Sequence, residues 1–229
     1  MEWPELLLID KPTGITSFDV IRQLRRMYRQ EHDGAKAPKL GHAGTLDPAA
    51  SGLMLIGVGS GTKKLAELIK FDKEYIADIL LGLSTTTGDR EGEVAMKQAV
   101  ELTADLRSAV TNVITDLPGI HHLPVSAYSA IKKDGVPMYK RARAAAKRGE
   151  VVTDVPVRDM VVHEAELLEI VDGEQPIIRV RFLVGSGTYI RSLAEEMGKL
   201  LGLPASLAAL RRTRVGQFAI EEAIPLSKL

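Results

Sequence analysis

The chain has 229 residues, 45% of them hydrophobic, and its 30 basic and 30 acidic side chains leave no net charge. It contains no cysteine, which excludes thiolate catalysis, cysteine-bound zinc and disulfides. The N-terminus lacks the basic start of a secretion signal, and no apolar stretch is long enough to span a bilayer. We therefore expect a cytoplasmic protein with no membrane segment, large enough to bury a core in one large domain.

The absence of net charge conceals three basic clusters. The first lies between residues 132 and 148, the second is Arg22, Arg25, Arg26 and Arg29, and the third is Arg211, Arg212 and Arg214. Acids gather elsewhere, in residues 164–174 and at Glu195 and Glu196. Each cluster alone is typical of a solvated helix face, whereas three together fit a surface that faces a polyanion. Both interpretations remain open at this point.

The first third of the chain predicts strands and helices separated by turns. Residues 5–10 are a buried strand, and apolar residues at helical spacing predict a helix over 16–28 with Thr16 or Ser17 as its N-cap. A polar, mobile loop follows at 29–38, then a stretch of small residues at 41–52. Residues 53–69 predict a strand, a glycine turn and a helix.

The rest of the chain continues this mixture. Residues 73–83 alternate as a half-buried strand, 85–94 form its turn, and 103–117 are an amphipathic helix capped by Thr103. A strand with an Asp-Gly turn is expected in 127–139, a strand at 176–184, a helix in 185–202 that ends at Gly202, and a final strand at 212–220. Strict βαβ alternation is missing, so the fold class is α+β with a mixed, largely antiparallel sheet flanked by helices.

Asp47 is the first candidate for chemistry, because it lies among small residues in "GHAGTLDPAASG". A metal site would need more ligands than nearby His42, and a glycosidase-like pair would need a second acid in a similarly bare loop. A lone nucleophile remains, since the small residues would let a flat ligand approach the carboxylate. An ordinary Asp-Pro turn explains the same spacing.

Three further residues have similar alternatives. His42 is a proton shuttle, a stacking group or a turn residue, and Tyr75 is a site residue or a core aromatic. Arg191 lies in the first turn of the predicted helix, where a cation is mildly unfavourable, so we expect it to have an anionic partner. The preceding "GSGTY" turn is only a weak signal for phosphate binding.

Six segments together resemble one family. They are "LLLIDKPTGITSFDVI", "KLGHAGTLDPAASGLMLIGVGSGTK", "DKEYIADILLG", "YSAIKKDGVPMYKRAR", "GSGTYIRSLAEEMG" and "LRRTRVGQF". In order and spacing they are similar to the bacterial tRNA pseudouridine-55 synthases, the TruB family, over about residues 6–226. The resemblance implies the pseudouridine synthase fold and conversion of the uridine at position 55 in the tRNA T loop to pseudouridine, without cofactor or metal.

The resemblance also implies roles for individual residues. Asp47 is the catalytic nucleophile, Tyr75 packs on the uracil and is a candidate for taking the C5 proton, and Arg191 pairs with the Asp47 carboxylate. The implied substrate-binding residues are His42, Gly44, Thr45, Leu46, Tyr189 and Leu210, together with Lys132, Lys140, Arg141 and Arg143 of a basic RNA-gripping insertion at about 123–150. The partner is the T-arm stem-loop of tRNA, and the enzyme is expected to be a monomer.

Some features depart from the family pattern. Thr86 stands where the family usually has aspartate, and "LPVSAYSAIK" lacks the usual Gln-x-Pro lead-in. We interpret residues 1–229 as a single catalytic domain without a complete C-terminal PUA domain, from which weaker tRNA affinity would follow. Two alternatives remain: an RNA-binding or tRNA-folding factor in which catalysis is secondary, and a member of the guide-RNA-dependent branch of the superfamily.

Overall fold

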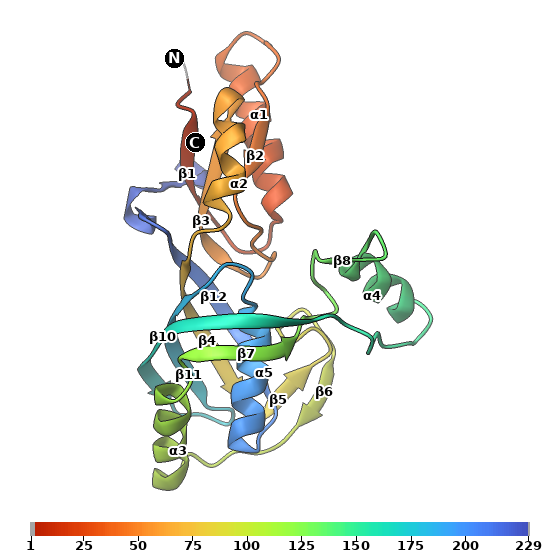
Figure 1. Cartoon of the computed structure of the whole chain (residues 1–229), viewed down its shortest axis with the longest axis vertical. Coiled ribbons are helices and arrows are strands. Elements are labelled where there is room, and N and C mark those ends of the chain that lie inside the picture. The colour runs from red at the N-terminus through yellow and green to blue at the C-terminus, as the bar shows by residue number, and fades with distance from the viewer. Residues whose placement is uncertain (1–2, 229) are drawn as a thin grey trace. The chain divides into compact units, whose positions relative to one another are not determined.

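The computed structural model describes residues 3–228 and divides into two compact units. Unit one holds the residues up to Ile76 and those from Ala209 onward, and unit two holds Ala77–Ala208. Strands β4 (Lys73–Leu81) and β12 (Ala205–Val215) contain the two division points, so each contributes residues to both units. Figure 1 shows the elements of the chain.

Unit one is a sheet with one long helix. Its order is β14-β1-β3-β12, with β2 paired to β3 and β13 to β12. Strands β1 and β3 are antiparallel, whereas β3 and β12 are parallel. The elements are β1 (Leu6–Lys11), α1 (Ser17–Glu31), β2 (Leu40–His42), β3 (Ser51–Val58), a 3-10 helix (Gly59–Lys64), α2 (Leu65–Leu68), β13 (Phe218–Ala219), a 3-10 turn (Ile220–Glu222), β14 (Ile224–Pro225) and a last 3-10 turn (Leu226–Lys228).

Local sequence explains how unit one is built. Helix α1 begins at a capping box, in which Thr16 accepts from the Asp19 N–H and Asp19 accepts from the Thr16 N–H. Apolar residues of β3, the loop before it, α2 and β12 meet in one buried cluster: Ala43, Leu53, Leu55, Leu68 and Val215. The loop that carries Asp47 therefore connects two strands at the edge of a packed core.

Unit two is a second, mostly antiparallel part. Its strand order is β12-β4-β11-β10-β7, and β10 is antiparallel to both β11 and β7. Its elements are β5 (Leu83–Thr85), β6 (Val94–Lys97), α3 (Ala104–Thr115), β7 (Gly119–Pro124), β8 (Lys132–Lys133), β9 (Val136–Pro137), α4 (Met138–Ala146), β10 (Val157–Val171), β11 (Ile177–Val184) and α5 (Ile190–Leu201). Strands β5 and β6 form one hairpin and β8 and β9 another.

The predicted fold class, α+β with a mixed and largely antiparallel sheet, is confirmed. Thr103 caps α3 and Gly202 ends α5 in the left-handed conformation, as expected. Four predictions need correction. Residues 127–131 do not form a strand, 212–220 forms two strands around a turn at Gly216, α2 has a single turn after a 3-10 helix, and β7 and β10 were not predicted. No helix within residues 3–228 is long and apolar enough to cross a membrane.

Candidate active site

The loop between β2 and β3 carries Asp47, and backbone hydrogen bonds fix it on both sides. The Ser17 hydroxyl, at the start of α1, accepts from the Leu46 N–H and donates to the Leu46 carbonyl, both at 2.9 Å. The Gly14 N–H donates to the Pro48 carbonyl at 2.8 Å, and the Ala50 N–H donates to the Asp47 carbonyl at 3.1 Å. Asp47 itself is half-buried. Its backbone is thus held from both neighbouring residues.

Lys11, a residue to which the sequence gave no role, supports the same loop. Its side chain has no solvent exposure, and Nζ donates to the carbonyls of Pro12 at 2.9 Å, Ile15 at 2.8 Å and Pro48 at 3.4 Å. An ammonium group has three protons to donate, so this arrangement suits a lysine. The only signal in the sequence is a lysine placed at the end of a buried strand.

Arg212 supports the loop from the other side. It is 1% exposed, and its guanidinium donates from Nε to the Leu53 carbonyl at 2.7 Å and from Nη2 to the Gly44 carbonyl at 3.3 Å. Arg211 pairs with Asp10 at 2.8 Å. The third basic cluster is therefore not a solvated, polyanion-facing run, because of its three arginines only Arg214 is exposed and without such contacts.

The small residues of the loop also have a packing reason. Gly52 has a φ of +111°, and a Cβ there would lie 2.3 Å from the Arg212 carbonyl oxygen on the neighbouring strand. Gly44 has a φ of +94°, which side chains rarely adopt. Ala43 and Ala50 are buried. Small residues near Asp47 are therefore required in part because β12 packs closely against this segment, and not only to admit a ligand.

The predicted substrate-binding residues of this loop differ in exposure. Thr45 is exposed, Gly44 and His42 are half-buried, and Leu46 is buried. Within the described residues His42 Nδ1 is buried without a hydrogen-bond partner. Burial and the nearby Arg212 charge lower the pKa of His42 below its usual 6.5, while a contact with the Gly44 backbone opposes this. Together, burial and the Arg212 charge favour the neutral imidazole over the imidazolium.

Tyr75 lies on β4 with its side chain buried, and Leu210 lies half-buried on the neighbouring strand β12. Two residues before Tyr75, Lys73 is also buried and points Nζ at the Ile69 carbonyl at 2.5 Å. Burial, followed by repulsion from Arg212, lowers the pKa of Lys73 to about 8, although Asp72 opposes the shift. Unit one thus buries three cations, Lys11, Lys73 and Arg212.

Arg191 belongs to unit two, in the first turn of α5, and is 4% exposed. Nη1 lies 3.4 Å from the Asp89 carboxylate and donates to the Thr87 carbonyl and the Ser126 hydroxyl, both at 2.9 Å. In unit two this arginine has an anionic neighbour in Asp89, which sequence reasoning had treated only as part of a turn. Its expected pairing with Asp47 stays a prediction. Tyr189 is the N-cap residue of α5 and is half-buried.

Glu195 adds another carboxyl group to this part of unit two, one helical turn after Arg191. Burial raises the pKa of Glu195 above its usual 4.5, and the nearby Asp89 carboxylate adds to the shift, against the charges of Lys199 and Arg191. Among residues 3–228, no group of three or more histidine, aspartate or glutamate side chains could hold a metal ion.

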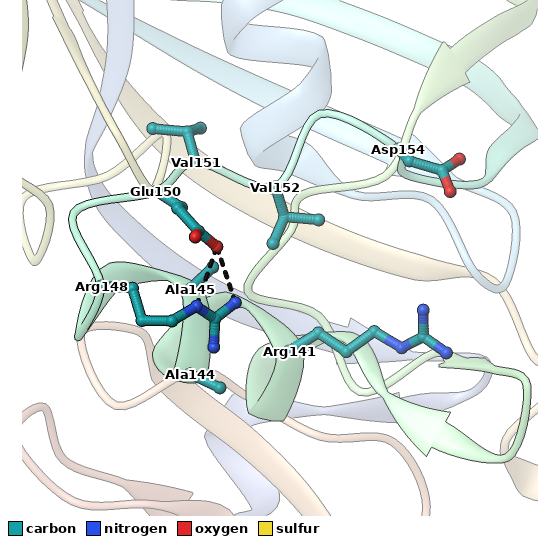
Figure 2. Close-up of a pocket in the computed structure, with 8 residues that line it drawn as sticks. All are labelled: Arg141, Ala144, Ala145, Arg148, Glu150, Val151, Val152 and Asp154. Atoms are coloured by element: carbon teal, nitrogen blue, oxygen red, sulfur yellow. Dashed lines mark hydrogen bonds and ion pairs between the residues drawn. The ribbon is translucent and has the colours of Figure 1, made fainter.

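The basic insertion of unit two, expected at about 123–150, contains the β8–β9 hairpin and α4, and the segment up to Asp154 follows it. Lys132, Lys140 and Arg143 are exposed, whereas Arg141 is half-buried and donates to the Lys133 carbonyl at 2.7 Å and to Asp134 at 2.9 Å. A cavity of about 360 Å³ lies between α4 and the following segment. Figure 2 shows Arg148 joined to Glu150 at its rim, with Arg141 directed away from that pair. In the insertion Lys132, Lys140, Arg143 and Lys147 are exposed, whereas Arg141 and Arg148 are paired with acids.

Comparisons with protein families connect this geometry to known proteins. Residues 25–190 match the N-terminal domain of the TruB family of pseudouridylate synthases, and residues 191–229 match the C-terminal domain of tRNA pseudouridylate synthase B. The tRNA pseudouridine synthase B of Corynebacterium efficiens is 44% identical over 225 residues, which cover 98% of this chain and 71% of that protein. The same enzyme of Leifsonia xyli is 44% identical over 227 residues, with equal coverage.

Solved structures have the same fold. A Cbf5-Nop10-Gar1 complex contains a chain with a TM-score of 0.70 and 27% identity, and an H/ACA RNP bound to a substrate RNA containing 2'-deoxyuridine contains one with a TM-score of 0.67 and 25% identity. Both comparisons cover 98% of this chain. They cover 53% and 51% of the solved chains, so this chain spans about half of their length.

Proposed function

The chain belongs to the TruB family of pseudouridylate synthases, and we propose from this that it isomerises uridine to pseudouridine in tRNA, at position 55 of the T loop. The observation that carries the proposal is the 44% identity to a tRNA pseudouridine synthase B over 98% of the chain. The anchored loop supports it, since a nucleophile must be held in place while its neighbourhood stays uncrowded.

In the proposed reaction the glycosidic bond between N1 and C1′ breaks, the base reorients, and a new bond joins C5 to C1′. The proton on C5 leaves and N1 gains one, so the change is an isomerisation that needs no oxidant or reductant. Asp47 is the proposed nucleophile, attacking either the uracil ring or C1′. Tyr75 packs against the ring and is the proposed acceptor of the C5 proton.

Arg191 is the proposed partner of the Asp47 carboxylate in the reacting complex. Its anchoring by Asp89, Thr87 and Ser126 supports this role, because a guanidinium already held in one orientation loses little entropy when it meets an anion. Lys11 and Arg212 add fixed positive charge around the same loop in unit one.

The proposed substrate is the T-arm stem-loop, whose uridine must leave its stack to be reached. The exposed Lys132, Lys140 and Arg143 of the basic insertion are suited to phosphate oxygens. The proposed substrate-binding residues of the loop directly precede Asp47 in the chain: His42, Gly44, Thr45 and Leu46. Of these, His42 is proposed to help displace the flipped nucleotide as a neutral ring. Tyr189 and Leu210 are proposed to line the pocket for the base.

Mapping of pseudouridine at single-nucleotide resolution tests the function. Unmodified tRNA transcript is incubated with the wild-type chain, Asp47→Asn and, as a matched control, Asp33→Asn, an exposed aspartate in a turn of the same unit. We expect modification at position 55 with the wild type and the control, and a loss of at least about 1,000-fold in rate with Asp47→Asn. RNA binding by Asp47→Asn should remain close to wild type. Substantial turnover by this variant would exclude Asp47 as the nucleophile.

The same experiment separates the two alternatives. Binding without any pseudouridine in the wild-type reaction would favour an RNA-folding factor in which catalysis is secondary. The neighbouring solved structures include an H/ACA RNP, so dependence on a guide RNA is a specific alternative. Modification of a bare transcript by the purified chain alone would exclude it.

A further inference from the structure

Helix α1 carries an exposed row of arginines that the proposed active site does not use. Arg22, Arg26 and Arg29 are exposed and recur at helical spacing on the side opposite the buried Val20, Ile21 and Leu24, with the half-buried Arg25 beside them. We call these four residues the α1 arginine stripe. Phe18 continues the row toward the N-terminus and is 57% exposed, and the Arg22 guanidinium lies 5.8 Å from its ring centre.

Most of the stripe lacks counter-charges. Arg22 pairs with Asp19, but within the described part of the chain no carboxylate lies at ion-pair distance from Arg25, Arg26 or Arg29. Glu31, the nearest acid on the helix, is engaged by the Trp3 indole N–H at 3.0 Å. The helix dipole favours Arg29 in the last turn. It does not account for four arginines on one face.

Some other arginines on the strands of this protein are paired with acids. Arg179 pairs with Asp78 and Glu169, and Arg181 pairs with Glu164 and Glu166. Arg211 pairs with Asp10, whereas Arg158 and Arg214 are exposed without a carboxylate at ion-pair distance among the described residues. The stripe stands out because four arginines lie on one helix, where like charges repel each other without a bound anion.

The stripe is fixed with respect to Asp47 within unit one. Ser17, the first residue of α1, holds the backbone of Leu46 next to Asp47 through its hydroxyl. At 1.5 Å per residue, Arg22 lies about 8 Å and Arg29 about 18 Å along the helix from that contact. The length from Arg22 to Arg29, about 10 Å, equals about three nucleotides of one strand of a duplex.

We propose that the α1 arginine stripe is a second RNA-binding surface, which contacts the phosphates of a substrate segment near the nucleotide that enters the Asp47 loop. Phe18 lies at the end of the stripe nearest Asp47, where an exposed ring can stack on a base. The inference rests on the proposed function for the identity of the RNA. The surface itself follows from the charge and geometry of α1.

The test is the salt dependence of tRNA binding in the Asp47→Asn background, which prevents turnover. The triple variant Arg25→Gln/Arg26→Gln/Arg29→Gln is compared with Lys97→Gln/Arg107→Gln/Lys199→Gln, which removes three exposed and ion-paired cations from unit two. Glutamine retains helix propensity, and thermal melting monitored by circular dichroism confirms that both variants fold. Dissociation constants for full-length transcript are measured between 0.05 and 0.3 M KCl.

We expect the triple variant to lower the slope of log K against log salt by about 2 to 3, because each phosphate contact contributes about 0.7 to 0.9. Affinity at 0.1 M salt should fall about ten- to a hundredfold, with the control within about twofold of its parent. An unchanged slope in the triple variant, or an equal loss in the control, would overturn the proposal. If the wild-type chain forms no pseudouridine but the triple variant still binds RNA more weakly, the proposed function is contradicted. The proposal that the α1 arginine stripe binds RNA is then still supported.

Discussion

Each of the two units buries one arginine, and the two differ in what surrounds the charge. Arg191 in unit two faces the Asp89 carboxylate as well as neutral oxygens. Arg212 in unit one donates to two backbone carbonyls, and its charge acts on His42 and Lys73, lowering the pKa of both. The first arginine is oriented by an anion, and the second holds the shape of a loop. Buried charge in this protein thus serves two purposes.

The largest effect should come from breaking the Arg191–Asp89 pair. Arg191→Met leaves the buried Asp89 carboxylate without its cation, so we expect the free energy of unfolding to fall by about 3 to 5 kcal/mol, measured by urea denaturation. Pseudouridine formation should be lost as well. The double variant Arg191→Met/Asp89→Leu removes both charges and should regain most of the stability.

Activity separates the structural from the catalytic role of Arg191. If Arg191 also pairs with the Asp47 carboxylate in the reacting complex, the double variant should be stable but inactive. Recovery of turnover together with stability would show that Arg191 acts only as a structural partner of Asp89.

Substitution of Arg212 should lower the free energy of unfolding less than substitution of Arg191 does, and its effect should be confined to the loop that carries Asp47. Arg212→Met leaves the Leu53 and Gly44 carbonyls without this donor, at a cost of about 2 kcal/mol in unfolding free energy. Hydrogen exchange should increase at residues 43–47, and the rate of modification should fall because the carboxylate is held less firmly. Arg212→Lys, which keeps the charge but loses the fork of donors, should give intermediate exchange. Wild-type exchange in Arg212→Met would contradict the assigned role.

Elements with their own local signals could be predicted from sequence. Helix α1 has the Thr16–Asp19 capping box, and β4 alternates buried and half-buried residues from Lys73 to Leu81. Strand β10 lacks a clear alternation of apolar and polar residues. Its Glu164, Glu166 and Glu169 form ion pairs with arginines of β11, the next strand along the chain. Those pairs exist only after the register of β10 and β11 is set.

The same limit applies to the candidate site. Asp47 stood out because its neighbours are small, and Arg191 because a cation in a first helical turn needs a partner. Arg212 looked like a surface residue, since its burial depends on the parallel pairing of β12 with β3. Lys11 gave only the weak signal of a lysine at the end of a buried strand, and Asp89 gave none. Their contacts with Pro48 and Arg191 join residues 37 and 102 positions apart. The role of a site residue could be predicted where the neighbouring residues of the same segment indicate that role.

Lys73 gives the smallest effect and a direct test of the charge around the Asp47 loop. Burial and the Arg212 charge lower its pKa to about 8 in the folded protein, below the 10.5 of an unperturbed lysine. Between these two values the unfolded chain binds the extra proton and the folded protein does not, so stability rises with pH through this window. From pH 7 to pH 9 the free energy of unfolding should increase by about 1 kcal/mol. Lys73→Met should abolish this rise, and Arg212→Met should reduce it, because loss of the guanidinium raises the pKa of Lys73. The prediction is contradicted if the free energy of unfolding of the wild type stays constant or falls from pH 7 to pH 9 and Lys73→Met behaves in the same way. The Lys73 ammonium would then be solvated, and Arg212 would not act on it.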